Sequence, residues 1–215
     1  MKKLLLLILL GLFVVFNSCT DYNKKINIMT YNIRLDTETD SINKWDNRKE
    51  GIVSLIKEED IHILGIQEAL PNQIEYLSQQ LKNYDYIGEG RDGGSKGEYS
   101  AIYFKSDNVI LEQEETFWLS ETPEIPTIGW DAAIKRIVTL GVFKIKNLEK
   151  KLIVYNTHFD HVGKVAREKS ASIILNHITK NSYQDKPTVV MGDFNANPDE
   201  STIKLLSEQL QDSFK

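Results

Sequence analysis

The sequence is poor in cysteine, in basic side chains and in long apolar runs. Cys19 is the only cysteine among the 215 residues, so no disulfide can form within one chain. A domain of this sequence that folds in an oxidising compartment must therefore be stabilised by its apolar core. Acidic residues outnumber basic ones and give a formal charge of −5. This acidity argues against tight, non-specific nucleic-acid binding, because such binding depends on cationic side chains that displace counterions.

The longest apolar run extends from Leu4 to Phe16 and is too short to span a bilayer comfortably, which takes about 20 residues. It follows two lysines and precedes the small Ser18, a pattern typical of a signal peptide. We therefore expect residues 1–19 to be a signal peptide ending at a lipidated Cys19, and residues 20–25 to be a tether. The protein would then be exported and anchored to a membrane of the cell envelope. Secretion with an incidental cysteine and an uncleaved N-terminal anchor remain alternatives.

Residues 26–215 are expected to form a single domain, since they contain no visible internal repeat or low-complexity tract. The first part of this domain alternates strand-like apolar runs with helix-like apolar stripes, which is typical of an α/β arrangement. From Tyr84 to Phe159 the pattern changes to strands joined by turns, and helices flank a further strand after that. Pattern alone thus predicts a mixture of α and β structure. The clearest strand runs in the middle part are residues 101–104, 137–143 and 152–155.

A glycine-rich stretch, residues 88–94, does not have the spacing of a dinucleotide-binding fingerprint and is not enclosed in a strand–helix–strand unit. We interpret it as a surface hairpin loop, which is able to border a cleft.

Polar residues with catalytic potential follow several of the apolar runs. Glu68 comes after the run 61–66, and Asp193 follows the run 188–191. Because strand ends hold side chains rigidly at the edge of a sheet, these groups are expected to gather there. Carboxylate, amide and histidine groups presented in this way suit divalent-metal-assisted hydrolysis of a phosphate ester.

Two pairs of residues have the spacing that places both side chains on one side of a strand. They are His158 with Asp160, and Asp193 with Asn195. The alternative interpretations are a structural histidine for the first pair and an Asx turn for the second. Arg136 precedes a strand and can clamp a phosphate with its planar fork, although a surface salt bridge explains it as well.

Four short motifs stand out: Thr30–Arg34, Gln67–Glu68, Asn156–His161 and Gly192–Asn195. In order and local sequence they resemble the endonuclease/exonuclease/phosphatase superfamily, whose fold is deoxyribonuclease-like. Residues 116–123, residues 129–133 and Arg136 further resemble a bacterial subgroup, often lipoproteins, within it. The resemblance implies an α+β fold, a four-layer α/β/β/α sandwich. Members close with a strand bearing an Asp and then a Ser-Asp-His motif, so we expect this fold to be C-terminally incomplete at Lys215.

The resemblance also implies roles for individual residues. Glu68 would bind Mg²⁺ or Mn²⁺, and Asn32 would orient that metal or a phosphate oxygen. Asp193 would orient or deprotonate the attacking water, while His158 and Asn195 would donate hydrogen bonds to the phosphate. The residues expected to bind substrate are Asn32, Arg136, Asn156 and Asp160.

We therefore predict a metal-dependent phosphoester hydrolase, either a phosphodiesterase such as a nuclease or a phosphatase. Its partners would be a phosphoester substrate and, through the lipid anchor, a membrane, with no obligate protein partner. Nucleic acid, a phospholipid headgroup and a small phosphodiester all remain possible substrates. The alternative is an inactive fragment or a non-catalytic phosphate-binding remnant of a longer enzyme, because the closing Asp and His are absent.

Overall fold

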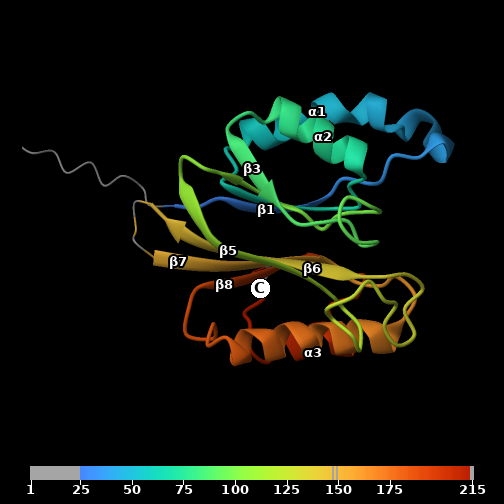
Figure 1. Ribbon diagram of the computed structural model, residues 1–215, viewed down its shortest axis with the longest axis vertical. Coiled ribbons are helices and arrows are strands. Elements are labelled where there is room, and N and C mark those ends of the chain that lie inside the picture. Colours follow the sequence, from blue (N-terminus) through green and yellow to red (C-terminus); the bar gives the residue numbers. More distant parts are fainter. Residues whose placement is uncertain (1–24, 147, 149, 214–215) are drawn as a thin grey trace, which may run out of the picture.

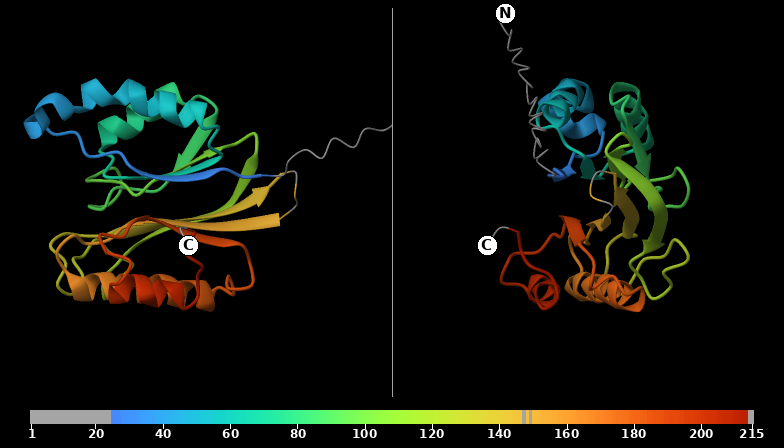
Figure 2. Two further views of the ribbon diagram at one scale, coloured as in Figure 1. Left: turned by 180° about the vertical axis from the view of Figure 1, so that it is seen from behind. Right: turned by 90° about the vertical axis from the view of Figure 1, so that its left-hand side faces the viewer.

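The computed structural model describes residues 25–146, 148 and 150–213, which fold into four layers (Figure 1). Two four-stranded sheets lie face to face, and helices cover the outer face of each, as Figure 2 shows from two further sides. The predicted α/β/β/α sandwich is thus confirmed. The predicted signal peptide and Cys19 lie outside the described residues, as does the tether except for Lys25.

The two sheets are built from consecutive halves of the chain. The first sheet has the order β1-β2-β4-β3 and the second β5-β6-β7-β8. In the first sheet the strands are β1 (Ile28–Asn32), β2 (Ile63–Gln67), β3 (Tyr84–Ile87) and β4 (Ile102–Lys105). In the second sheet they are β5 (Val109–Trp118), β6 (Ile137–Ile145), β7 (Lys150–His158) and β8 (Thr188–Asp193).

Helices α1 (Trp45–Glu58) and α2 (Pro71–Gln80) cover the first sheet, and η1 (Glu38–Asn43) precedes them. Helices α3 (Lys164–Lys180) and α4 (Ser201–Ser207) cover the second sheet. In the described ranges, no helix combines the length and the apolar character needed to cross a membrane.

Three clusters of buried apolar side chains hold the four layers together. One packs α1 and α2 on the first sheet, around Ile56 and Leu77. A second packs α3 and α4 on the second sheet, around Tyr155 and Ile174. The third lies between the sheets and includes Phe143. With a single cysteine in the sequence, this apolar packing is the main stabilising contribution.

Strand β5 was not among the clearest runs because its middle, Glu112–Glu115, is acidic. It is an edge strand, it carries an irregularity in its pairing between Leu111 and Gln113, and its acidic side chains are largely solvent-exposed. Charged side chains and an irregular register are common on edge strands, where they oppose pairing with another chain.

Strand directions bring the ends of four strands to one end of the sandwich. β1 runs parallel to β2 and β7 runs parallel to β8, so Asn32 lies beside Gln67 and His158 beside Asp193. These ends lie opposite the start of β1, where the described chain begins (Figure 1). The motif residues that follow the strands are therefore gathered at one place.

A buried amide joins the two sheets just beneath this end. The Nδ2 of Asn156, on β7, donates to the carbonyl oxygens of Ile66 (2.9 Å) and Ala101 (2.8 Å). Its Oδ1 accepts from Nε2 of Gln67 at 2.6 Å. Gly65 permits this approach, because a Cβ at that position would lie 2.6 Å from the Asn156 oxygen.

Replacing Asn156 with Ala is expected to lower the free energy of unfolding by about 3 kcal/mol, because it removes three buried hydrogen bonds between the sheets. Urea unfolding followed by circular dichroism measures the change. Asn83→Ala, at an exposed position between α2 and β3, is the matched control and should change the stability little. A loss at Asn156 no larger than in this control would contradict the inter-sheet role.

Candidate active site

The site lies where the ends of β1, β2, β7 and β8 meet, and it contains groups from both sheets. Asn32 and Glu68 come from the first sheet, and His158 and Asp193 from the second. Asn195 follows β8 by two residues. The structure thus brings together the predicted metal ligands and the predicted catalytic residues.

Asn32 links the two sheets at the site. Its Nδ2 donates to Oε1 of Glu68 at 2.8 Å and to Oδ2 of Asp193 at 3.0 Å. Its Oδ1 accepts from the backbone N–H of Arg34 at 2.9 Å, which fixes the orientation of the amide. Two carboxylates from different sheets are therefore held on one nitrogen atom.

Glu68 is held by its backbone as well as by its side chain. Its φ of 65° lies in the left-handed region, which costs a residue other than glycine roughly 1–3 kcal/mol. Its Oε2 accepts from the backbone N–H of Leu35 at 3.0 Å. Residues in such strained conformations cluster at functional sites, and here the strain aims the carboxylate into the cleft between the strand ends.

Asp193 is ionised at neutral pH. Burial raises the pKa of this carboxyl, but hydrogen bonds from Asn32 and from the backbone N–H of Asn195, together with nearby His158, outweigh burial and lower it. The Asn195 N–H lies 3.0 Å from Oδ1, so the Asx turn considered for this pair does form. The turn and a functional carboxylate coexist, because the turn occupies only one of the two oxygens.

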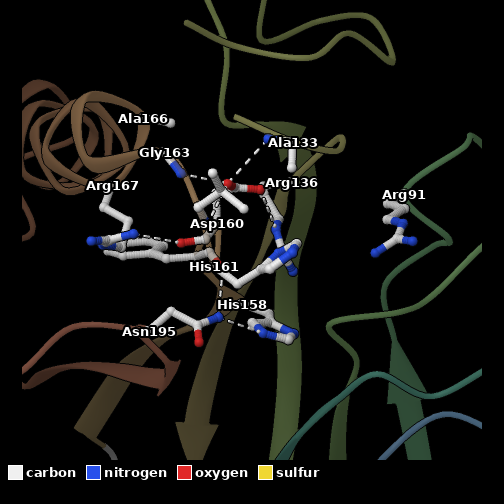
Figure 3. Close-up of polar contacts among 12 residues, drawn as sticks. Arg91, Ala133, Arg136, His158, Asp160, His161, Gly163, Ala166, Arg167 and Asn195 are labelled. Atoms are coloured by element: carbon white, nitrogen blue, oxygen red, sulfur yellow. Dashed lines mark hydrogen bonds and ion pairs between the residues drawn. The ribbon is translucent and has the colours of Figure 1, made fainter. Parts of the chain in front are cut away.

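The amide of Asn195 determines the tautomer of His158. Its Nδ2 donates to the carbonyl oxygen of Phe159 at 3.0 Å, and a carbonyl can only accept, so this atom is the nitrogen. The same Nδ2 lies 2.9 Å from Nε2 of His158, which must then accept (Figure 3). The proton of the neutral imidazole is thus on Nδ1, a buried atom with no partner among the described residues.

Both amide hydrogens of Asn195 are used in these contacts. The resemblance implies that Asn195 donates a hydrogen bond to the phosphate. In this arrangement its amide hydrogens are directed to His158 and to the carbonyl of Phe159 instead.

The imidazole of His158 is neutral well below pH 7. Burial is the main cause and the positive charge of Arg136 the second, and together they lower its pKa to about 4. Asp193, whose Oδ2 lies 3.8 Å from Nε2, opposes this shift. The group is therefore a hydrogen-bond donor through Nδ1 at physiological pH.

Arg136 lies beside His158 and is oriented by Asp160 (Figure 3). Its Nε lies 3.3 Å from Oδ2 of Asp160, and its Nη2 donates to Nδ1 of His161 at 3.1 Å. The side chain is 5% exposed and borders the same pocket as Glu68 and His158.

Two residues expected to bind substrate are placed elsewhere. Asn156 is fully buried between the sheets, where its amide is occupied by the contacts described above. Asp160 is 1% exposed, and its Oδ1 accepts from the backbone N–H groups of Ala133, Val162 and Gly163. Burial raises the pKa of Asp160, but the hydrogen bonds from these N–H groups and the charge of Arg136 outweigh burial and lower the pKa to about 2. Asp160 is a permanent counter-ion that positions Arg136.

Sequence reasoning missed three charged residues of the site. Arg91, Glu98 and Lys135 border the pocket together with Glu68, Arg136 and His158. Arg91 belongs to the glycine-rich loop, so the expectation that this loop is able to border a cleft is confirmed. The only sequence signal was a charged residue in a loop fixed by glycines, which is common on any surface.

The oxygen donors of the site fit a hard divalent cation. Each oxygen of Glu68 accepts one hydrogen bond from the protein and retains a further lone pair. The carboxylate of Asp193 is close by, because it accepts from the same nitrogen of Asn32 as Glu68 does. Within the described part of the chain, no three His, Cys, Asp or Glu side chains are grouped to enclose a metal. An ion such as Mg²⁺ needs only one or two carboxylates, because water and phosphate oxygens complete its shell.

The sequence profile of the Endonuclease/Exonuclease/phosphatase family matches residues 29–213. The chain belongs to this family, as its motifs predicted. The match covers every residue of the site described above.

Solved structures and a curated relative resemble the whole described domain. A mannosyl-6-phosphatase from Bacteroides thetaiotaomicron is 34% identical, with 86% of this chain and 70% of that chain covered and a TM-score of 0.82. An endonuclease/exonuclease/phosphatase from Bacteroides vulgatus is 38% identical, with 84% and 69% covered and a TM-score of 0.80. An uncharacterized protein of Acanthamoeba polyphaga mimivirus is 31% identical over 185 residues, which cover 82% of this chain and 67% of that protein.

The pKa of His158 gives a pH dependence that can be measured on the metal-free protein. The folded chain should hold this imidazole neutral down to about pH 4, whereas the ordinary pKa is 6.5. Between these values the unfolded chain binds a proton that the folded chain does not, so stability should fall as the pH is lowered from about 6.5 toward 4. Two-dimensional NMR of the imidazole nitrogens measures the titration. A midpoint at or above 6.5 would contradict the burial argument.

Proposed function

We propose that this protein is a divalent-metal-dependent phosphoester hydrolase. The observation that carries the proposal is the joining of Glu68 and Asp193, from different sheets, on the amide of Asn32. The neutral His158 donor lies beside this pair. Acceptors for a cation and a donor for an anion are thus combined at one place, as phosphate-ester hydrolysis requires.

Glu68, with Asn32 orienting it, would hold Mg²⁺ or Mn²⁺. When bound, such an ion polarises a phosphate oxygen and compensates developing negative charge. Asp193, ionised and fixed by two hydrogen bonds, orients the attacking water and accepts its proton. His158 donates from Nδ1 to a non-bridging oxygen as charge builds there, and Asn195 holds the ring for that contact.

Arg136 stabilises the same charge with a guanidinium that Asp160 keeps in place. The site is open to substrate, because two grooves meet at Asn32. One borders the end of β8 and residues 194–197, and the other borders Arg34, Thr37 and Asp40. The similarity to a protein named mannosyl-6-phosphatase supports an ester-hydrolysing activity.

Metal dependence and the role of Glu68 can be tested in one assay. The purified protein is mixed with p-nitrophenyl phosphate or bis(p-nitrophenyl) phosphate, with Mg²⁺, Mn²⁺ or a chelator. We expect turnover that requires the ion and that falls at least about 100-fold in Glu68→Gln, since one charged ligand is lost. Glu58→Gln, an exposed acid at the end of α1, is the matched control and should retain full activity.

Turnover that persists in chelator, or that survives unchanged in Glu68→Gln, would overturn the metal-assisted reaction. Absence of turnover from a well-folded preparation would overturn catalysis by this chain.

We also propose that the protein is exported and lipid-anchored at Cys19, on the basis of the apolar run and the small residue before that cysteine. In cells that express the full chain, Cys19→Ser should abolish incorporation of labelled fatty acid and move the protein out of the membrane fraction. Thr20→Ala is the control and should stay in the membrane fraction. Unchanged labelling of Cys19→Ser would exclude this residue as the anchor.

A further inference from the structure

Two of the three buried polar side-chain atoms that lack a partner in the described part of the chain border one pocket. These two are Nη1 of Arg91 and Nδ1 of His158. Buried donors without an acceptor are rare in folded proteins, and each one calls for a ligand, a water or a catalytic role. Both atoms are donors here, because guanidinium cannot accept and the proton of His158 is on Nδ1. Two donors at this pocket are therefore without an acceptor.

Arg91 is fixed in place by its own loop and by the second sheet. Its backbone N–H donates to the carbonyl of Glu98 at 2.9 Å, and its own carbonyl accepts from the indole N–H of Trp118, on β5, at 2.8 Å. Its Nη2 lies 2.8 Å from Oε1 of Glu98, and the two side chains are only 20% and 14% exposed. Figure 3 shows Arg91 to one side of Arg136 and His158.

Glu98 thus holds one arm of the guanidinium fork, and the other arm is left for a ligand. A planar fork with one arm fixed is well suited to a phosphate oxygen, because little side-chain freedom is lost on binding. Burial is the main cause that lowers the pKa of Arg136, which borders the same pocket, and the positive charge of Arg91 adds to it.

Three cationic side chains border the pocket, and each of them has a carboxylate partner. Arg91 is paired with Glu98, Lys135 with Asp92 and Arg136 with Asp160. What distinguishes the pocket is therefore the donors that have no acceptor, Nη1 of Arg91 and Nδ1 of His158. A phosphodiester has two non-bridging oxygens, whereas a phosphomonoester has three terminal oxygens. The third terminal oxygen can accept from the free arm of Arg91, and a diester has no such oxygen.

We propose that Arg91 binds a terminal oxygen of a phosphomonoester dianion and makes the site select monoesters over diesters. This inference rests on the proposed function, of which it specifies the substrate class. Arg91 is in this sense a specificity-determining residue, and the glycine-rich loop that carries it is part of the substrate site.

The test compares kcat/KM for p-nitrophenyl phosphate and for bis(p-nitrophenyl) phosphate in the purified protein and in Arg91→Gln. We expect the monoester value to fall roughly 10- to 100-fold, the range for a charged hydrogen bond, and the diester value to change much less. Arg91→Lys keeps the charge and the contact with Glu98 but lacks the second arm, so it should also lose monoester selectivity. Lys96→Gln removes an exposed charge from the same loop and should change neither value.

Equal losses for both esters in Arg91→Gln, or an equal effect of Lys96→Gln, would overturn the selective role. A second measurement separates this inference from the proposed reaction: the shift in Tm caused by inorganic phosphate with Mg²⁺. If the protein hydrolyses neither ester, the proposed reaction fails. A phosphate-induced shift that is lost in Arg91→Gln but kept in Lys96→Gln would still support the anion contact, and an equal shift in all three proteins would overturn it.

Discussion

Asn156 lies between the two sheets, and its amide is hydrogen-bonded to two carbonyls and one side chain of the opposite sheet. A sandwich held only by apolar side chains could slide by a fraction of a residue at small cost, because apolar packing is not directional. Directional hydrogen bonds from a fully buried amide oppose such a slide, since it would break all three of them. The alignment of the sheets beneath the site therefore depends on this contact, and Asn32 extends the connection to the site itself.

The site is built so that most of its polar residues hold another residue in place. Asn32 holds two carboxylates, Asn195 holds the ring of His158, and Asp160 holds Arg136. Few groups are then left to act on a ligand, but those few are rigid before the ligand arrives. Rigid donors and acceptors stabilise a developing charge without first having to reorganise, which is the physical basis of electrostatic catalysis. The left-handed backbone conformation of Glu68 also fits a site whose groups are held in place before a ligand binds.

Much of the fold and half of the site followed from the sequence for local reasons. Apolar runs predicted the strands, and the polar residues just after them predicted Glu68 and Asp193. Predictions from the sequence failed where the position of a residue along its strand, and hence its depth between the sheets, determined its contacts. Asn156 lies on the same face of β7 as His158 but two residues earlier, about 7 Å deeper, which removes it from the cleft. Both residues belong to one motif, so nothing local distinguished them.

Arg91 illustrates the other kind of failure. It is 67 residues from His158 in the sequence, and contacts of its loop with Trp118 and Lys135, which are distant in sequence, bring it to the second sheet. The formal charge of −5 likewise gave no sign that three cationic side chains border one pocket, because net charge averages over surfaces that never face one ligand. Within the pocket the potential is set by the nearest buried groups, where screening by water is weakest. Each of these cations has a carboxylate partner, so the pocket offers a phosphate oxygen buried donors that lack an acceptor and no excess of positive charge.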